Sequence, residues 1–322
     1  MKLGVMMALL SQKPLEEALD YVAEAGLEMV EFATGGYGGK PHCDPDVLLN
    51  DDAALENLQK ALKDRNLGIS SLSCHGNPLH PQSEIAEKDD EDYRKTVLLA
   101  EKLGIDVVNC FSGCPGDSKG SRYPNWVTCP WPPDFLEILE WQWNEKVIPY
   151  WKKASSFAKE HGVNLGFEMH PGFVVYNPET LLKLRNECGD NIGSNFDPSH
   201  LFWQGIDPIA AIKELGKASA IYHTHAKDTR VDEMNVSVNG VLDTKHYGDE
   251  LNRAWIFRTV GYGHDAAFWK DFVSILRTVG YDGVISIEHE DSLMSVDEGF
   301  KKAVAFLKAL LLTEPAGEMW WA

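Results

Sequence analysis

The sequence has few of the features expected of a secreted or membrane protein. Its 322 residues include only six cysteines, and they are scattered along the chain without any CxxC pair. Small disulfide-stabilised domains carry cysteine far more densely. No apolar run approaches the ~20 residues that a membrane-spanning helix requires. We therefore expect reduced thiols, a cytoplasmic location and no membrane partner.

Positive charge is also scarce. The chain has 30 Lys and Arg residues against 49 Asp and Glu residues, which gives a formal net charge of −19. A field of this sign repels phosphate backbones and anionic lipids, so nucleic acids and membrane surfaces are excluded as expected partners. The hydrophobic fraction of 44% is ordinary for a globular protein, and a chain of this length can bury a large core without disulfides.

One pattern recurs through most of the chain: an amphipathic helix, a glycine near its end, and a short strand rich in Val and Ile. In its first occurrence the helix ends near Gly26 and leads into the strand 29–32. Glycine is favoured there because a chain leaving a helix often adopts a left-handed conformation. The later glycines of the pattern are Gly68, Gly104, Gly162, Gly216 and Gly280.

Eight strands are predicted in total. They lie near Leu3–Met7, Met29–Phe32, Ile69–Ser73, Val107–Phe111, Asn164–Phe167, Ile192–Phe196, Ala220–His225 and Val284–Ile287. Eight alternating units predict one closed (β/α)8 TIM barrel that spans residues 1–322 as a single domain. A doubly wound open sheet is the alternative, but no glycine-rich dinucleotide fingerprint follows the first strand.

Two long segments interrupt the pattern, residues 112–146 after the fourth strand and residues 226–266 after the seventh. Both follow strands, and the carboxyl-terminal face of a barrel is where such enzymes keep their active sites. Long loops in compact domains usually serve as lids or partner contacts, so we expect a lid here. The alternative is that each segment is a surface loop without a catalytic role.

Four strand ends carry polar residues that a strand core would not select. They are Glu168, Asp197, one histidine of the pair His223 and His225, and Glu288. In a barrel these ends meet around one rim, and three carboxylates buried together need a cation to neutralise them. Oxygen ligands with one imidazole suit Mn²⁺ best, with Mg²⁺, Co²⁺ and Zn²⁺ as alternatives. Taken singly, each residue could instead be an ion-paired rim residue.

Further polar residues are candidates for binding the substrate. His223 and His225 are two residues apart on one strand and therefore point to the same face, so the histidine that does not bind metal could contact substrate. The other candidates, each with a surface or structural role as the alternative, are His75, His200, Lys227 and Arg258.

The ordered set of Glu168, Asp197, His225 and Glu288 resembles the xylose isomerase-like barrel superfamily, and within it the sugar phosphate isomerase and epimerase group. The motifs Asp197-Pro198-Ser199-His200 and His225-Ala226-Lys227-Asp228 carry the resemblance. The His-x-His motif of ketose 3-epimerases, whose second histidine is the ligand, implies that His225 binds the metal. The resemblance also implies that Glu168 and Glu288 exchange a proton beside a substrate carbonyl.

The resemblance implies a metal-dependent isomerase or epimerase acting on a carbohydrate. This sequence differs from ketose epimerases in its two long segments and in Met169-His170 after the first glutamate. A lyase or dehydratase acting on a 3-keto-glycoside or an inosose therefore remains the alternative. A DNA-repair endonuclease of the same superfamily needs a basic face, which the −19 charge opposes. The intact ligand set argues against a non-enzymatic scaffold.

The carboxyl-terminal tail carries two adjacent tryptophans, Trp320 and Trp321. Two indole rings are costly to leave in water, so we expect them to dock either on the barrel or on a neighbouring subunit. The second case would make the protein a homo-oligomer joined through its tail.

Overall fold

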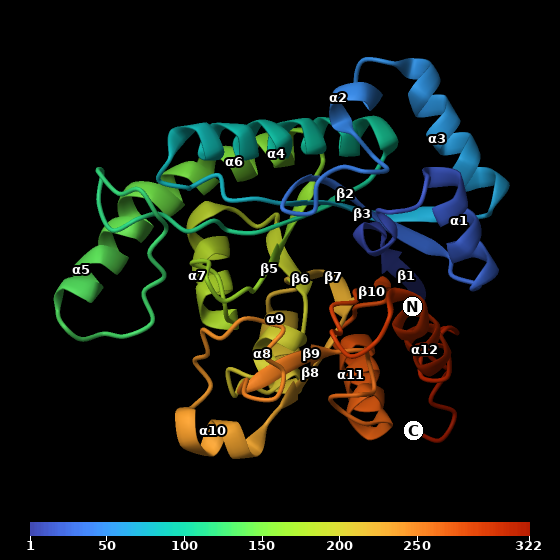
Figure 1. Ribbon diagram of the computed structural model, residues 1–322. Helices are drawn as coiled ribbons and strands as arrows, with labels where there is room; N and C mark the ends of the chain where they lie inside the picture. The colour runs from blue at the N-terminus through green and yellow to red at the C-terminus, as the bar shows by residue number, and fades with distance from the viewer.

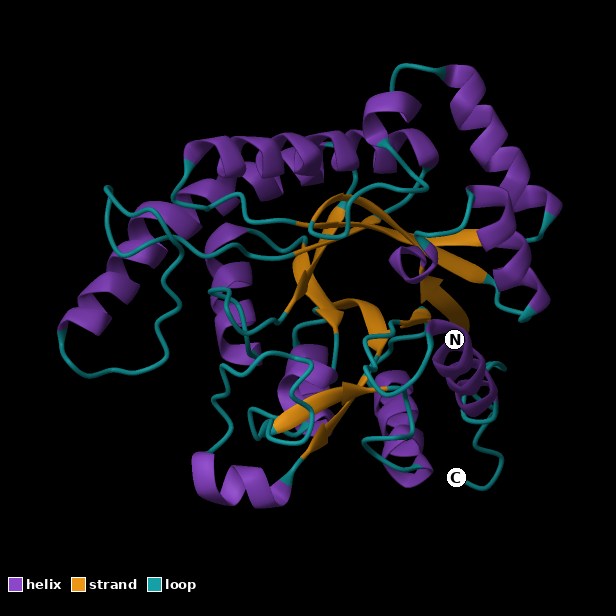
Figure 2. Cartoon of the chain, in the orientation of Figure 1, coloured by secondary structure: helices purple, strands orange, loops and turns teal.

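The computed structural model describes residues 1–322 and confirms the predicted barrel. Eight parallel strands close on one another in the order β1-β10-β7-β6-β5-β4-β3-β2, and Figure 2 shows them as a ring enclosed by helices. The barrel strands are β1 (Lys2–Met6), β2 (Met29–Gly36), β3 (Gly68–His75), β4 (Val107–Cys110), β5 (Asn164–Glu168), β6 (Ile192–Phe196), β7 (Ile221–Ala226) and β10 (Val284–Ile287).

The connections between the strands are mainly helical. None of these helices combines the length and the apolar character that crossing a bilayer would require. They are α1 (Leu15–Glu24), α2 (Pro45–Leu48), α3 (Asp52–Asp64), α4 (Ser83–Leu103), α5 (Asp134–Trp141), α6 (Ile148–Glu160), α7 (Pro178–Cys188), α8 (Ser199–Phe202), α9 (Pro208–Lys217), α10 (Glu233–Asn239), α11 (Ala266–Thr278) and α12 (Val296–Lys308), with a 3-10 turn at Met7–Leu10 and a π-helical segment at Gln142–Val147.

Alternate residues of each strand separate an apolar core from a polar barrel interior. The core lies outside the ring, between strands and helices, and includes Phe32, Leu72 and Ile285, each fully buried. Their strand neighbours Glu31 and Ser73 point the other way, because successive side chains face opposite sides of a sheet. Barrels are usually filled by branched apolar side chains, so a polar interior indicates a functional requirement.

A glycine makes room for part of this interior. A Cβ added to Gly166, on β5, would lie 2.4 Å from the side-chain oxygen of Asn109 on β4. The missing side chain lets Asn109 reach across the interior, where its amide donates to Glu31 and to Ser71. The close approach explains a glycine in the middle of a strand.

The glycines of the repeated pattern take two different roles. Gly26, Gly104, Gly162 and Gly280 have left-handed backbones, with φ between 70° and 88°, as the pattern predicts. Gly68 and Gly216 do not, and that part of the prediction is wrong. In those two units the left-handed residues are Asn66, two residues before Gly68, and Ser219, three residues after Gly216.

The segment 112–146 does not contribute to the cavity at the strand ends. It is irregular as far as residue 133, and then forms α5 and the π-helical segment. Figure 1 shows α5 extending away from the barrel. The buried amide of Gln142 donates to the carbonyls of Pro115, Gly116 and Asn125 and so holds the irregular part together. No residue of the segment lines the cavity over the strand ends, and a lid formed by this segment stays a prediction.

The segment 226–266 is more ordered than a loop. Two strands, β8 (Asp228–Val231) and β9 (Trp255–Arg258), pair in an antiparallel ribbon and are joined through α10. Trp203 stacks on Trp255 beneath the ribbon, with 4.6 Å between ring centroids. The ribbon lies beside the barrel (Figure 1), and its Lys227 and Phe257 border the cavities described below.

The tail does not fold back onto the barrel. Arg277 donates to the carbonyls of Leu312 and Glu314 and fixes the chain to that point. Beyond it, Trp320 and Trp321 are 86% and 69% exposed. Docking of the tryptophan pair within the chain is therefore not observed, and docking on a neighbouring subunit stays a prediction.

The carboxylate of Asp228 joins the two ends of the segment 226–266 and links them to α11. It is fully buried, and its Oδ2 accepts hydrogen bonds from the backbone N–H groups of Gly261, Gly263 and His264 and from the indole of Trp269. A carboxylate oxygen can accept from several donors at once, whereas an amide group at the same place brings N–H groups of its own.

We predict that Asp228→Asn lowers the free energy of unfolding by about 2–3 kcal/mol, because buried N–H groups lose their acceptor. Urea denaturation followed by circular dichroism measures the change. Asp271→Asn, on the exposed surface of α11, is the matched control and should alter stability by less than ~0.5 kcal/mol. Equal stability of the two variants would show that Asp228 does not anchor the segment.

Candidate active site

The four predicted ligands meet at the carboxyl-terminal end of the barrel. Glu168 ends β5, Asp197 follows β6, His225 lies in β7, and Glu288 follows β10. One potential ligand atom from each residue lies within 4.8 Å of the other three. Asp197 and His225 are almost completely buried, and Glu168 is 3% exposed. Strands far apart in the sequence thus bring three carboxylates and one imidazole to a single point.

Several atoms of this cluster make no hydrogen bond. The Nδ1 atom of His225, the Oδ2 atom of Asp197 and the Oε2 atom of Glu288 are buried without a hydrogen-bond partner. Buried polar atoms are nearly always paired in native proteins. These three ligand atoms face one another and are balanced only by ion-pair contacts, among them those with Lys227. With oxygen donors in the majority, they fit a hard or borderline divalent cation.

Lys227 lies directly beside the cluster. Its side chain is 2% exposed, and its Nζ lies 3.2 Å from Asp197 Oδ2 and 3.0 Å from both Glu288 Oε2 and Glu290 Oε2. Burial alone lowers the pKa of Lys227, but these carboxylates raise it well above its ordinary value. Lys227 therefore stays charged and balances part of the local negative charge.

His75 and His200 flank Glu168. The Nε2 atom of His75 lies 3.3 Å from Glu168 Oε2, and that of His200 lies 3.0 Å from Glu168 Oε1 and 3.3 Å from Asp197 Oδ2. Burial raises the pKa of Glu168, but the contacts with His200 and His75 hold it well below its ordinary value. The structure thus brings both predicted histidines to the cluster.

His223 and Arg258 lie elsewhere. His223 is buried inside the barrel, below the cluster, and contacts Asn195 Oδ1 at 3.0 Å and Ser70 Oγ at 3.2 Å. Burial lowers its pKa to about 4, so it is uncharged at neutral pH. The guanidinium of Arg258 is held by Asp291, 3.0 Å away. Neither residue lines the cavity, and their predicted contact with substrate stays a prediction.

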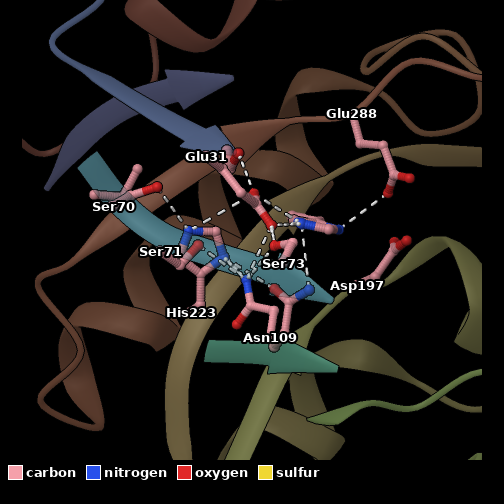
Figure 3. Close-up of polar contacts among 12 residues, drawn as sticks. Glu31, Ser70, Ser71, Ser73, Asn109, Asp197, His223 and Glu288 are labelled. Atoms are coloured by element: carbon pink, nitrogen blue, oxygen red, sulfur yellow. Dashed lines mark hydrogen bonds and ion pairs between the residues drawn. The ribbon is translucent and has the colours of Figure 1, made fainter. Parts of the chain in front are cut away.

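A fifth ionised residue, Glu31 on β2, supports the cluster from inside the barrel. Both of its oxygens lie 3.0 Å from His225 Nε2, and it also accepts hydrogen bonds from Ser73, Asn109 and Ser286. Figure 3 shows Glu31 among Ser73, Asn109 and His223, with Asp197 and Glu288 on the far side. Burial raises the pKa of Glu31, but the charge of His225 holds it well below its ordinary value.

The contact with Glu31 determines which nitrogen of His225 faces the cluster. A carboxylate can only accept hydrogen bonds, so Nε2 of His225 must carry the proton that points at Glu31. Nδ1 lies 3.0 Å from Glu288 Oε2 and 3.6 Å from Glu168 Oε2. Burial lowers the pKa of His225, but Glu31 and Glu288 raise it well above its ordinary value, so without a metal Nδ1 also carries a proton. A cation at the cluster would replace that proton and take the Nδ1 lone pair. Carboxylate partners such as Glu31 orient metal-binding histidines in proteins.

Glu31 is not among the residues expected from the sequence, although the sequence contains a signal for it. Glu31 interrupts the apolar strand Met29-Val30-Glu31-Phe32, and polar residues likewise alternate with apolar ones in Ser71-Leu72-Ser73. Charge in the middle of a buried strand is costly unless it has partners. Such alternation could have indicated a polar barrel interior.

A cavity of about 320 Å³ opens onto the cluster. Glu168, Glu288, His75 and Lys227 line its polar part. His170 also lines it and was not predicted as a site residue. Burial lowers the pKa of His170 to about 3, so this ring is uncharged at neutral pH. The volume is at the lower limit of the ~300–1,000 Å³ usual for ligand sites.

Comparisons with known proteins agree with this geometry. The model of the xylose isomerase-like TIM barrel family matches residues 19–310. The chain is 41% identical over 311 residues to the uncharacterized protein YfiH of Bacillus subtilis (strain 168), covering 96% of this chain and 98% of that protein.

Two solved structures show the same fold. The structure of a D-tagatose 3-epimerase-like protein aligns with a TM-score of 0.64 at 20% identity, over 96% of this chain and 98% of that one. The IOLI protein with a bound zinc atom aligns with a TM-score of 0.64 at 17% identity, over 97% and 98%. The fold, the strand-end cluster and the matched family model agree with the resemblance seen in the sequence, and the chain belongs to the xylose isomerase-like TIM barrel family.

Proposed function

We propose that this protein is a divalent-metal-dependent isomerase or epimerase that transfers a proton beside the carbonyl of a keto-sugar. The observation that carries the proposal is the pair Glu168 and Glu288. Both line one cavity, and both approach the same Nδ1 atom of His225, from β5 and from β10. A substrate carbon held in this cavity would have one carboxylate on either side.

The charge state of the two glutamates suits this role. Burial raises the pKa of Glu288, but Lys227 and His225 lower it to about 2. The pKa of Glu168 is also well below its ordinary value. Both groups are therefore ionised at neutral pH and can accept a proton. In the proposed cycle one carboxylate takes a proton from the substrate carbon. The second, ionised at rest, takes a proton from solvent or a substrate hydroxyl and delivers it to the opposite face, and the first then returns its proton to the same source.

The metal ligands would be Glu168, Asp197, His225 and Glu288. A bound divalent ion polarises a carbonyl and makes the hydrogen on the adjacent carbon more acidic. The structure of the IOLI protein contains zinc. The three carboxylates favour Mn²⁺ in this chain, with Mg²⁺, Co²⁺ and Zn²⁺ as alternatives.

The neighbouring side chains would hold the substrate. Lys227 carries the positive charge that a developing oxyanion requires, and His75 and His200 offer ring N–H groups to hydroxyl oxygens. Phe111 and Leu9 supply apolar surface to the same cavity. Such walls limit the access of water to a carbanion-like intermediate.

A lyase acting on a 3-keto-glycoside or an inosose would begin with the same proton abstraction. Its second step would expel a substituent instead of returning a proton. Return of a proton to the opposite face of the carbon requires a second acid–base group, and both Glu168 and Glu288 line the cavity. We therefore place isomerisation or epimerisation first, and product analysis distinguishes the two.

The first prediction concerns the metal. The protein should bind one divalent ion per chain, and Mn²⁺ should raise the melting temperature, because a ligand that binds only the folded state stabilises it. Melting curves with EDTA and with Mn²⁺, together with elemental analysis after dialysis, measure this. A protein that retains no metal and melts at the same temperature in both buffers would not contain the site.

The second prediction concerns Glu31. Glu31→Gln should weaken metal binding roughly 10–100-fold, because the amide removes the negative charge that makes His225 a stronger ligand and leaves one acceptor oxygen in place of two. Competition with a fluorescent chelator measures the affinity, after circular dichroism has shown that the variant is folded. Glu28→Gln, an exposed residue just before β2, is the control. Equal affinities in both variants would limit Glu31 to a packing role.

The third prediction concerns the proton transfer. In D₂O the metal-loaded protein should introduce deuterium beside the carbonyl of a ketohexose such as D-fructose, D-tagatose or L-sorbose, as detected by mass spectrometry. Glu168→Gln and Glu288→Gln should each lower the rate by ~10²–10⁴-fold, since each removes an acid–base group. Glu137→Gln, on the exposed part of α5, should have no effect.

Bound metal must be measured on the same samples, because both glutamates are also proposed ligands. A metal-loaded variant that keeps near-full activity would remove its residue from the mechanism. His200, which contacts Glu168, would then be the next candidate for the base.

A further inference from the structure

A second cavity, of about 290 Å³, adjoins the one over the carboxylate cluster. His170 and Glu290 line both cavities, so the two share a wall. The remaining residues of the second cavity are Tyr247, Ile256, Phe257 and Ser292. A substrate that reaches the cluster can therefore extend past Glu290 into a separate space.

The far wall of the second cavity is built by the segment 226–266. Phe257, on β9, is buried, and Tyr247 lies nearly parallel to it, with 5.9 Å between ring centroids and 21° between ring planes. The guanidinium of Arg253 lies 4.4 Å from the Tyr247 ring centroid. Tyr247 is thus held in place although 55% of its surface is exposed. An aromatic ring that its neighbours hold in place, and that is still partly exposed, can contact the apolar side of a bound ligand.

The charges around this cavity oppose an anionic ligand. The nearest cation, Lys227, is already shared among three carboxylates, and Glu290, one of those three, lines the cavity itself. Arg258 is paired with Asp291, and Arg253 donates to the backbone carbonyls of Lys245 and Trp255. A phosphate group would meet a carboxylate there without a free cation.

The lining matches an uncharged sugar ring. Tyr247, Ile256 and Phe257 give the cavity an apolar wall, with Arg253 over the Tyr247 ring and Lys227 over the Phe257 ring. The exposed part of Tyr247 can contact the C–H groups of a pyranose, and Glu290 and Ser292 can bond its hydroxyl groups. An aromatic wall combined with a few polar groups gives a site both affinity and orientation.

We propose that Tyr247, Ile256, Phe257, Glu290 and Ser292 form a subsite for a second sugar ring, so that the substrate is an unphosphorylated keto-sugar carrying a glycosyl substituent. The identity of the reacting ring rests on the proposed function, whereas the subsite rests on the second cavity. The keto-sugar lies over the carboxylate cluster, and the glycosyl group packs against Tyr247.

Calorimetric titration of the Mn²⁺-loaded protein tests the subsite. The probes are D-fructose, D-fructose 6-phosphate, and the glucosyl-fructoses turanose, leucrose and isomaltulose, which differ only in the position of the linkage. At least one disaccharide should bind roughly tenfold more tightly than D-fructose, and the phosphate should bind no better than D-fructose.

Variants of Tyr247 test whether this residue causes the tighter binding of the disaccharide. Tyr247→Ala should weaken binding of the preferred disaccharide by roughly three- to tenfold, the range expected for loss of one aromatic contact, and leave D-fructose unchanged. Tyr247→Phe keeps the ring and should bind like the wild type. Tyr123→Ala, another exposed tyrosine, which lines neither cavity, is the control.

The outcomes separate the subsite from the reaction. Equal affinity for D-fructose and all three disaccharides, equal losses for every sugar in Tyr247→Ala, or no binding of any probe would overturn the subsite. Tighter binding of the phosphate than of any disaccharide would also overturn it. Disaccharide binding that depends on Tyr247, without deuterium exchange, would support the subsite and contradict the proposed reaction.

Discussion

The contact between Glu31 and His225 is the interaction on which the site depends. It places a carboxylate, fully buried, against one nitrogen of an imidazole and so leaves the other nitrogen facing Asp197 and Glu288. An ionised group inside a barrel is stable only with partners, and the hydrogen bonds from Ser73, Asn109 and Ser286 supply them. The polar barrel interior is therefore the support of the cluster above it.

The same electrostatic constraint shapes the surroundings of the cluster. Glu168, Asp197 and Glu288 repel one another, and Lys227 offsets part of that repulsion from the edge of the cavity. A divalent cation among the ligand atoms that face one another would offset the rest. Because Lys227 is committed to carboxylates, the two cavities have no free cation for a phosphate group. The same negative charge that would stabilise a bound metal therefore disfavours phosphorylated substrates.

Much of the site could be predicted because barrel geometry converts sequence order into position. Glu168, Asp197, His225 and Glu288 each lie at a strand end, and parallel strands in a closed barrel end at one rim. The position of Arg258 could not be predicted in this way, because its pairing with Asp291 depends on how the segment 226–266 folds. The ribbon of β8 and β9 was not predicted either. Its two strands are separated in the sequence by a long connection that includes α10.

The sequence by itself determined the barrel, its eight strands and the three carboxylates of the cluster, because these follow from local periodicity and from the position of polar residues at strand ends. The choice of His225 over His223 came from the family resemblance. Only the tertiary structure decided that Glu31 fixes the ring of His225, that His223 lies below the cluster, and that Tyr247 and Phe257 form a second cavity. Each of these depends on contacts between strands or segments distant in sequence. The direction and depth of a side chain inside a closed barrel are set by register and by neighbouring volumes, such as the space left by Gly166, and these are properties of the packed structure.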